Sequence, residues 1–434
     1  MSLVEITAVE RLTAGSDALL GYSIDLPKAG ATAEAYCFEL AGWVLGNNTS
    51  AVEVELIAND GPVRTLPVLY PRSDVDRCYP QAAAGSKVGF WSPVSVVGMT
   101  PDFELFVQAV LEGGVRVPMA RLRGRHQSIP SLFRPSIQPL LVTSLGRMGT
   151  TWVMRLLAEH PNIAALRLYP YETRPGRYWM QLLGAMVEPA FPAQSASRLG
   201  ILEEDWWSAQ DPFQRASLGR YPALQQWFNA QFVEQTASLC QRSIEDCYQQ
   251  IAVAQHQQPT YFAEKHIPDE APGIIWELYP HAREIFVVRD LRDMLCSIRA
   301  FNTKRGTLGF ARNLFNSEEE YVQYVARVSH RLLSSWRTRK ARACLVRYED
   351  LLQAPETALQ SMLAYLDLER GSSVIDGMLQ RAMLDTPELQ AHRTSSDALA
   401  SIGRWRSDLD PATQQLCDTA FGDALAEFGY EGRQ

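Results

Sequence analysis

The sequence predicts an α/β fold, a three-layer sandwich of helices around a parallel sheet, preceded by an all-β domain. From residue 140 on, short apolar runs of strand character alternate with helical patterns, which is typical of a parallel sheet covered by helices. Before residue 126, apolar and polar residues alternate and turn signals separate the runs. The chain has 434 residues, of which 46% are hydrophobic, so it can bury a sizeable core in more than one domain.

The N-terminal part, residues 1–125, is predicted to be a β-sandwich-like accessory domain. Val52 and Val54 alternate with acidic neighbours, and Asn, Asp and Gly residues mark turns between such runs. Two antiparallel sheets packed face to face are the simplest fit. The proline-containing residues 126–139 are predicted to be a linker, and the arginines at 121–125 are expected to be solvated.

The turn that follows residues 140–143 is predicted to hold an anion. Gly146 and Gly149 let the backbone turn its N–H groups toward a ligand, and Thr150 and Thr151 open the following helix with hydroxyl donors. A helix N-terminus carries a partial positive charge, which favours negatively charged groups. The strand, the glycine-punctuated loop and the helix therefore form an anion cradle.

This loop differs from the phosphate-binding loop of nucleoside triphosphatases. That loop needs Gly-x-x-x-x-Gly-Lys-Ser/Thr, whereas here no lysine precedes the threonine pair and the glycines stand closer together. Arg147 supplies the full positive charge instead. A P-loop nucleotide or small-molecule kinase would also need an acidic residue at a second strand end for Mg²⁺, and it is therefore kept only as an alternative.

Later segments bring further polar side chains to the carboxyl edge of the predicted sheet. The apolar run at 284–288 ends in Arg289, at the edge where ligands of doubly wound folds bind, and Ser297 follows eight residues later. Another strand-like run ends in Tyr348. Residues 403–405 belong to a basic, aromatic loop before the last predicted helix.

These motifs together resemble those of sulfotransferases that use 3′-phosphoadenosine 5′-phosphosulfate (PAPS). Arg-x-Gly-Thr-Thr-Trp, the Arg and Ser eight residues apart, Tyr-Glu-Asp-Leu and Gly-Arg-Trp-Arg occur in the family's order and approximate spacing. The chain is similar to the bacterial type of this family over roughly residues 136–434, with an added N-terminal β domain. The resemblance implies a P-loop-like three-layer sandwich at 140–434, with a helical acceptor-side insertion at about 176–258.

The resemblance also implies the nucleotide-binding residues. Arg289 and Ser297 bind the 3′-phosphate in this family, the loop holds the 5′-phosphosulfate, and Trp152 and Tyr348 contact the adenine. Met148 stands where serine is common, but its backbone N–H is kept. The predicted set is Ser144, Arg147, Met148, Gly149, Thr150, Thr151, Trp152, Arg289, Ser297, Tyr348, Gly403, Arg404 and Trp405.

The catalytic residues implied by the resemblance are Arg147, Lys265 and a general base for which two residues compete. Glu172 lies in Tyr-Glu-Thr-Arg, which is similar to the Glu-Glu-Thr-Arg of tyrosylprotein sulfotransferases, whose base is a glutamate. His266 lies in Glu-Lys-His-Ile-Pro, which is similar to the Lys-Thr-His-x-Pro of cytosolic sulfotransferases, whose base is a histidine. In that alignment the lysine is displaced by one position. We favour Glu172 and keep His266 as the alternative.

The expected reaction moves the sulfuryl group from PAPS to a hydroxyl or, as a second choice, an amine, and leaves adenosine 3′,5′-bisphosphate. The acceptor class stays open between a small molecule, a glycan and a carrier-bound intermediate. Aromatic residues of the 176–258 region, such as Trp206 and Trp207, could line its pocket. A non-catalytic glycan-binding protein, with Trp43 or Trp91 on a binding face of the β domain, is the second alternative.

Composition excludes several other classes. The net charge of −8 argues against nucleic acid as a partner. The seven cysteines are scattered without a Cys-x-x-Cys pair, and no metal-ligand cluster accompanies the site residues, so no metal is expected. The sequence starts without a signal peptide and has no run of about 18 apolar residues, which predicts a cytoplasmic protein without a transmembrane segment.

Overall fold

The computed structural model describes residues 2–12, 17–58, 61–80, 86–187, 220–268, 272–384, 386–387, 390, 393–394 and 397–430. The chain divides into two compact units. The first contains Met1–Arg134, Trp179–Gln241 and Gly273–Leu278, and the second contains Pro135–Tyr178, Arg242–Pro272 and Tyr279–Gln434. The predicted domain boundaries stay a prediction, and Trp206 and Trp207 lie outside the described residues.

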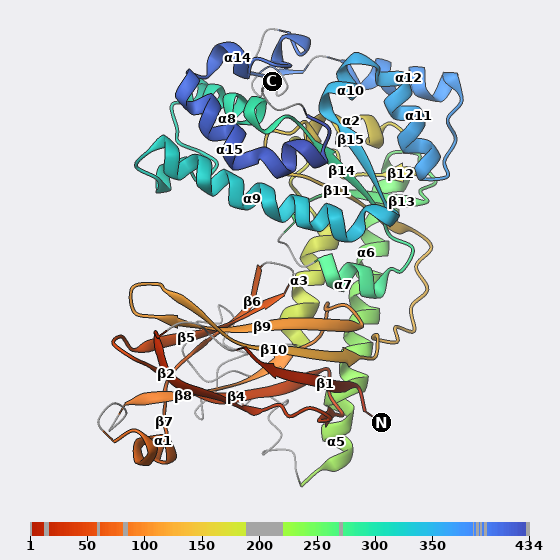
Figure 1. Cartoon of the computed structure of the whole chain (residues 1–434). Helices are drawn as coiled ribbons and strands as arrows, with labels where there is room; N and C mark the ends of the chain where they lie inside the picture. Colours follow the sequence, from red (N-terminus) through yellow and green to blue (C-terminus); the bar gives the residue numbers. More distant parts are fainter. Residues whose placement is uncertain are drawn as a thin grey trace. The chain divides into compact units, whose positions relative to one another are not determined.

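The first unit contains two antiparallel sheets (Figure 1). Its strands are β1 (Val4–Arg11), β2 (Leu19–Leu26), β3 (Thr32–Ala33), β4 (Cys37–Gly46), β5 (Ala51–Ala58), β6 (Gly61–Pro67), β7 (Tyr70–Pro71), β8 (Lys87–Ser95), β9 (Asp102–Leu111) and β10 (Arg116–His126), with helix α1 (Ser73–Cys78) after β7. One sheet has the strand order β3-β1-β10-β9-β5-β6, and the other has β2-β4-β8-β7.

Alternating burial explains why these strands form. On β9, Phe103, Leu105 and Val107 are buried while Asp102, Glu104 and Phe106, which alternate with them, are exposed, as the period of two of a strand requires. Phe103 stacks on Phe38 of β4 with ring centroids 6.1 Å apart, which joins the two sheets through their inner faces. The predicted all-β N-terminal domain is therefore confirmed.

The expectation that the arginines at 121–125 are merely solvated is wrong. These residues lie in β10, and Arg125 pairs with Glu5 of β1 at 2.7 Å. Arg123 pairs with both Glu10 of β1 and Glu104 of β9, also at 2.7 Å. The register places opposite charges on adjacent strands, so the side chains meet across the sheet surface.

The second unit is built on a five-stranded parallel sheet of order β12-β13-β11-β14-β15. The strands are β11 (Gln138–Thr143), β12 (Ile163–Ala164), β13 (Tyr261–His266), β14 (Arg283–Val288) and β15 (Ala343–Arg347). The helices of this unit include α2 (Thr150–Ala158), α8 (Leu291–Arg305), α9 (Glu318–Arg339), α10 (Tyr348–Gln353), α11 (Pro355–Tyr365), α12 (Ser372–Ala382), α14 (Trp405–Asp408) and α15 (Pro411–Glu427).

Four further helices come from the region of the predicted insertion and its surroundings: α3 (Pro175–Val187), α5 (Pro222–Gln226), α6 (Phe232–Ala254) and α7 (Pro272–Leu278). A π-helical turn, η1 (Trp227–Gln231), joins α5 to α6. The remaining short helical turns are η2 (Arg312–Leu314), η3 (Lys340–Arg342) and η4 (Leu399–Ser401).

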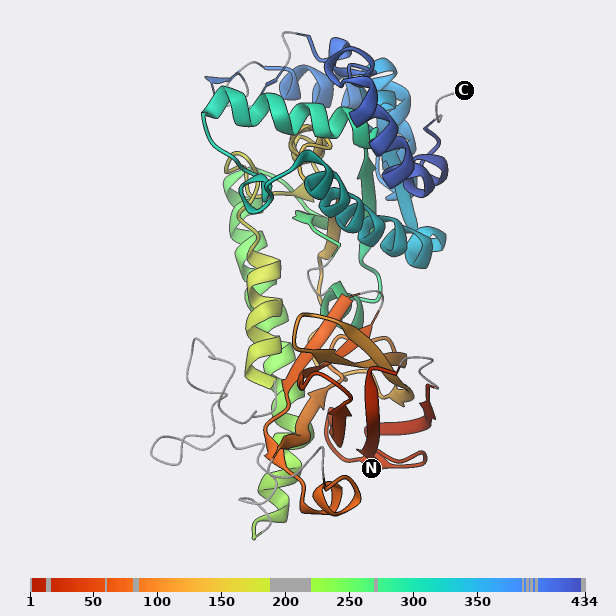
Figure 2. The same cartoon turned by 60° about the vertical axis from the view of Figure 1, so that its left-hand side comes forward.

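Successive side chains of β14 point to opposite faces of this sheet and build two cores. Ile285 and Val287 pack with α2, α11 and α12, whereas Phe286 and Val288 pack with α8, α9 and α15. Figures 1 and 2 both show α9 and α15 side by side on one face. The sheet is thus covered by helices on both faces, which confirms the predicted three-layer α/β sandwich.

A buried ion pair lies within this sandwich. Glu284 of β14 is fully buried and accepts two hydrogen bonds from Arg339 of α9, at 2.6 and 3.1 Å, and one from the hydroxyl of Thr143. Glu284 therefore joins the end of α9 to β14 and to β11. Removing the arginine would leave an uncompensated charge in the interior.

We expect Arg339→Met to lower the free energy of unfolding of this unit by about 3–5 kcal/mol, because Glu284 would stay buried without its partner. The matched control is Arg337→Met on the same helix. The Nε of Arg337 lies 3.1 Å from an oxygen of Glu427, and this ion pair is at the surface. An exposed pair contributes less than about 1 kcal/mol. Chemical denaturation of both variants measures the difference, and equal losses would contradict the assignment.

Candidate active site

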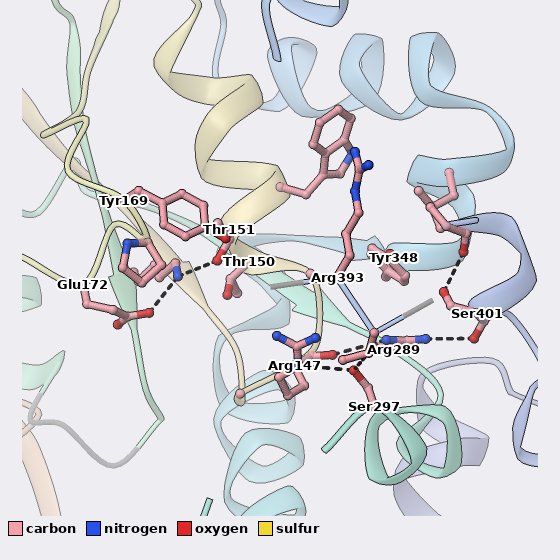
Figure 3. A pocket seen from close by; sticks show the side chains of 18 of the residues that line it. Arg147, Thr150, Thr151, Tyr169, Glu172, Arg289, Ser297, Tyr348, Arg393 and Ser401 are labelled. Carbon is pink, nitrogen blue, oxygen red and sulfur yellow. Dashed lines mark hydrogen bonds and ion pairs between the residues drawn. The ribbon is translucent and has the colours of Figure 1, made fainter. Parts of the chain in front are cut away.

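A cavity of about 430 Å³ lies at the carboxyl edge of the parallel sheet (Figure 3). Because β11, β13, β14 and β15 are parallel, the loops after all four strands meet at this edge. The lining residues are Gly146, Arg147, Gly149, Thr150, Thr151, Trp152, Tyr169, Pro170, Glu172, Lys265, Arg289, Ser297, Phe310, Tyr348, Leu352, Met383, Arg393, Thr394, Ala398 and Ser401.

Residues of the predicted anion cradle line the cavity. Gly149 is the residue before α2 and has a φ of +92°, a conformation that favours glycine. A Cβ at this position would lie 2.3 Å from the ring of Tyr348. Gly146 is required for space, since a Cβ there would lie 2.7 Å from the ring of Phe310. Both glycines let neighbouring side chains close on the loop.

Arg147 lies between these glycines and reaches toward α8. Its Nε donates to the hydroxyl of Ser297 at 3.2 Å. Burial and, as the second cause, the nearby Arg289 guanidinium together lower the pKa of Arg147 to about 10. A site that brings two guanidiniums together in a half-buried cavity is stabilised by an anion.

Arg289 follows the end of β14 and is buried. It donates to the carbonyl of Ser401 at 2.8 Å, and its guanidinium lies 4.8 Å from the ring centroid of Tyr348. Its Nε has no hydrogen-bond partner among the described residues. A buried donor without a partner is costly, so a hydrogen-bond acceptor at this atom would be favourable.

Lys265 connects the cradle to the predicted base Glu172. Its Nζ donates to the hydroxyl of Thr151 at 2.9 Å and to the carboxylate of Glu172 at 2.7 Å (Figure 3). Burial lowers the pKa of Lys265, and the Glu172 carboxylate partly opposes this shift. The side chain of Glu172 is 55% exposed, so it faces the open part of the cavity.

The other candidate base, His266, lies outside the cavity lining. It is the last residue of β13, its side chain is buried, and its Nε2 has no hydrogen-bond partner among the described residues. Burial lowers its pKa to about 3. The structure therefore separates the two candidates, with Glu172 on the cavity and His266 in the interior.

Two predicted loop residues also turn away from the cavity. Ser144 donates from its hydroxyl to the carbonyl of Val287 at 2.6 Å and joins β11 to β14. Met148 is fully buried in the core formed by β14, α8 and α15. The thioether at this position fills the interior, which accounts for an apolar residue in an otherwise polar loop.

Residues 403–405, which were predicted to close over the nucleotide, do not line the cavity. Their backbone is instead bound by a carboxylate. Asp293 of α8 accepts hydrogen bonds from the backbone N–H of Gly403 at 2.6 Å and of Trp405 at 2.9 Å. Trp405 is buried, with the guanidinium of Arg292 3.8 Å from its ring centroid, and Arg404 pairs with Asp408. The nucleotide contacts of this segment stay a prediction.

Several lining residues were not predicted. Tyr169 and Pro170 precede Glu172, Phe310 lies between α8 and α9, and Arg393 and Thr394 follow α12. Tyr169 and Pro170 stand just before the Tyr-Glu-Thr-Arg segment, whereas no motif marks Phe310, Arg393 or Thr394, because long stretches of chain separate them from the loops they adjoin. Thr394 lies 3.3 Å from the hydroxyl of Ser297 (Oγ1 to Oγ), which only the folded chain reveals.

Comparison with known proteins decides the family. A model described as the sulfotransferase family matches residues 139–371, more than half of the chain. The chain belongs to the sulfotransferase family. The search of curated proteins gave no match.

Several solved structures are similar to this sulfotransferase. One is a sulfotransferase domain from the curacin biosynthetic pathway, which has 15% sequence identity and a TM-score of 0.40. That match covers 69% of this chain and 100% of the curacin domain. Sulfotransferase STF9 from Mycobacterium avium has 16% identity, 69% and 79% coverage and a TM-score of 0.36. Mouse sulfotransferase SULT7A1 complexed with PAP has 11% identity, 67% and 85% coverage and a TM-score of 0.36.

The described residues of this sulfotransferase show neither a metal-binding cluster nor a membrane-spanning helix. They include no group of three or more His, Cys, Asp or Glu side chains arranged to hold a metal ion. Within the same residues, no helix has the length and apolar character needed to cross a membrane.

We expect Gly149→Ala to destabilise the protein by about 2–5 kcal/mol, because the Cβ adds both left-handed strain and a clash with Tyr348. Gly306→Ala is the matched control, since Gly306 has a φ of +64° but open space around its Cβ position. It should cost only the strain, about 1–2 kcal/mol. Thermal denaturation compares the two variants, and a smaller loss in Gly149→Ala would show that the cradle does not need glycine.

Proposed function

We propose that this sulfotransferase moves the sulfuryl group from PAPS to a hydroxyl of an acceptor, with Glu172 as general base. The observation that carries the proposal is the cavity itself, which brings the cradle, the Arg289–Ser297 pair and the Lys265–Glu172 pair into one space. A kinase is not favoured, because the loop of this chain lacks the lysine that a kinase of this type needs. The proposed acceptor is a small molecule, a glycan or a carrier-bound intermediate.

The cationic side chains of the cavity support an anionic nucleotide. Arg289 and Ser297 are proposed to bind the 3′-phosphate, and the cradle with Arg147 is proposed to bind the 5′-phosphosulfate. The partnerless Nε of Arg289 fits this role. Trp152 and Tyr348, which both line the cavity, are proposed to contact the adenine.

The chemistry follows from where the charges lie. Glu172 takes the proton of the acceptor hydroxyl, whose oxygen forms a bond to sulfur while the bond from sulfur to the 5′-phosphate oxygen breaks. Negative charge then develops on that phosphate, and Arg147 and Lys265 stabilise it. Lys265 contacts both Thr151 of the cradle and Glu172, which supports a role between the donor and the acceptor.

Binding of adenosine 3′,5′-bisphosphate tests the nucleotide site. Calorimetry should show binding by the wild-type protein and a loss of about 1.5–3 kcal/mol in Arg289→Ala, because one charged phosphate contact is removed. Arg299→Ala, in the helix α8 that follows Arg289, is the control. Arg299 forms an ion pair with Glu318 at 2.6 Å and does not line the cavity. Unchanged affinity in Arg289→Ala would overturn the assignment of the 3′-phosphate.

The base is tested by Glu172→Gln, which keeps the shape but removes the proton acceptor. With ³⁵S-labelled PAPS and a cell extract as the source of acceptor, we expect transfer to fall roughly 10²–10⁴-fold while nucleotide affinity stays unchanged. His266→Asn should be much milder in folded protein, because His266 lies outside the cavity lining. The opposite ranking would make His266 the base.

The pH profile of the same reaction tests Lys265. Its lowered pKa means that the ammonium group loses its proton at a lower pH than an ordinary lysine. If the charged form of Lys265 is needed, kcat should decrease on the alkaline side of the profile at a lower pH than an ordinary lysine would give. Lys265→Arg should move this decrease to higher pH. A decrease unchanged in Lys265→Arg would contradict a role for the charge.

A further inference from the structure

Arg147 has a backbone conformation that needs external support. Its φ is +66°, in the left-handed region that residues other than glycine rarely adopt. Such a conformation is strained and persists only where the surroundings impose it, most often at functional sites. The residue that carries the loop's full charge therefore depends on its neighbours for its backbone conformation.

Those neighbours lie on one face of α8. Ser297, Phe301 and Arg305 follow one another at intervals of four residues, so they share a helix face. Ser297 accepts the hydrogen bond from Nε of Arg147. The guanidinium of Arg147 lies 4.6 Å from the ring centroid of Phe301, and that of Arg305 lies 4.7 Å from the same centroid.

A second aromatic ring extends this contact to the glycine before Arg147. Phe310 packs edge-to-face on Phe301, with ring centroids 5.8 Å apart. Its ring also closes over Gly146, where a Cβ would approach it to 2.7 Å. The main chain that presents Phe310 is anchored, because the hydroxyl of Tyr321 donates to the Phe310 carbonyl at 3.1 Å. The two rings thus adjoin consecutive residues of the cradle.

We propose that Phe301 is a positioning residue that holds the Arg147 guanidinium, through a cation–π interaction, in the orientation that binds the 5′-phosphate group of the nucleotide. This inference rests on the proposed function for the identity of the ligand. The ring face contacts the guanidinium in addition to the hydrogen bond that its Nε donates to Ser297. Phe301 is buried, so water competes little for the cation.

An aromatic ring at Phe301 has an advantage over a carboxylate because the ligand is an anion. A carboxylate in this place would neutralise Arg147 and repel the phosphate. The negative face of an aromatic ring attracts the guanidinium without carrying a net charge, so the full positive charge of Arg147 stays available to the anion.

The test replaces Phe301 with mono-, di- and trifluorophenylalanine, which keep the ring's shape but progressively weaken its negative face. The readout needs no acceptor. It is the ratio of the dissociation constant of adenosine 3′-monophosphate to that of adenosine 3′,5′-bisphosphate, which isolates the contribution of the 5′-phosphate. We expect the ratio to fall stepwise, by about 5- to 30-fold for the trifluorinated ring, while the affinity for adenosine 3′-monophosphate stays constant.

Two controls separate positioning from simple packing. In an Arg147→Ala background the fluorine series should have no effect on the ratio, because the partner of the ring is gone. The same series at Phe421, a buried core ring of α15 over which no guanidinium lies among the described residues, should leave the ratio unchanged. The inference would be overturned if the ratio of dissociation constants stayed constant across the fluorine series at Phe301, or if it fell equally in the series at Phe421.

The result also distinguishes this inference from the proposed function. If the wild-type protein did not bind adenosine 3′,5′-bisphosphate in preference to adenosine 3′-monophosphate, the assignment of the cradle to the 5′-phosphate would fail, and the role of Phe301 with it. If the preference were present but insensitive to fluorination, the proposed function would stand and only the role of Phe301 would be rejected.

Discussion

The parallel pairing of β11 with β13 on one side and β14 on the other is the constraint on which the site depends. It brings the loop after residue 143, Lys265 near the end of β13 and Arg289 after β14 to one edge of the sheet. A register shift of one residue in any of these strands would turn its side chains to the opposite face. The buried Glu284–Arg339 pair and the two cores on β14 therefore also stabilise the geometry of the cavity.

The cavity gathers positive charge at a cost in the protein without ligand. Burial lowers the pKa of both Arg147 and Lys265, which means that the protein environment disfavours their charged forms relative to water. Part of this cost is offset locally, by the Glu172 carboxylate for Lys265 and by the Phe301 ring for Arg147. An anionic ligand would offset more of it, so the same features that cost stability favour binding.

Buried carboxylates hold the segments that adjoin the cavity. Glu264 of β13 accepts hydrogen bonds from the backbone N–H groups of Gly176 and Arg177 at the start of α3, a few residues after Glu172. Asp293 does the same for Gly403 and Trp405, and burial raises its pKa to about 6. Acidic residues next to the site motifs thus serve the backbone, while Glu172 alone among these three lines the cavity.

The sequence by itself determined the α/β and all-β architecture and the glycine positions of the loop after residue 143, because strand periodicity and glycine positions are local properties of the chain, and Arg289 and Ser297 were singled out by the family resemblance. It left Glu172 and His266 as rival bases, since a motif cannot show which side chain faces a cavity and which is buried. Phe301, Phe310 and Thr394 carried no motif, and the arginines at 121–125 were misjudged. Only the tertiary structure shows where these side chains lie and what they contact, because burial and contacts between distant segments arise when the strands pair and the helices pack on them.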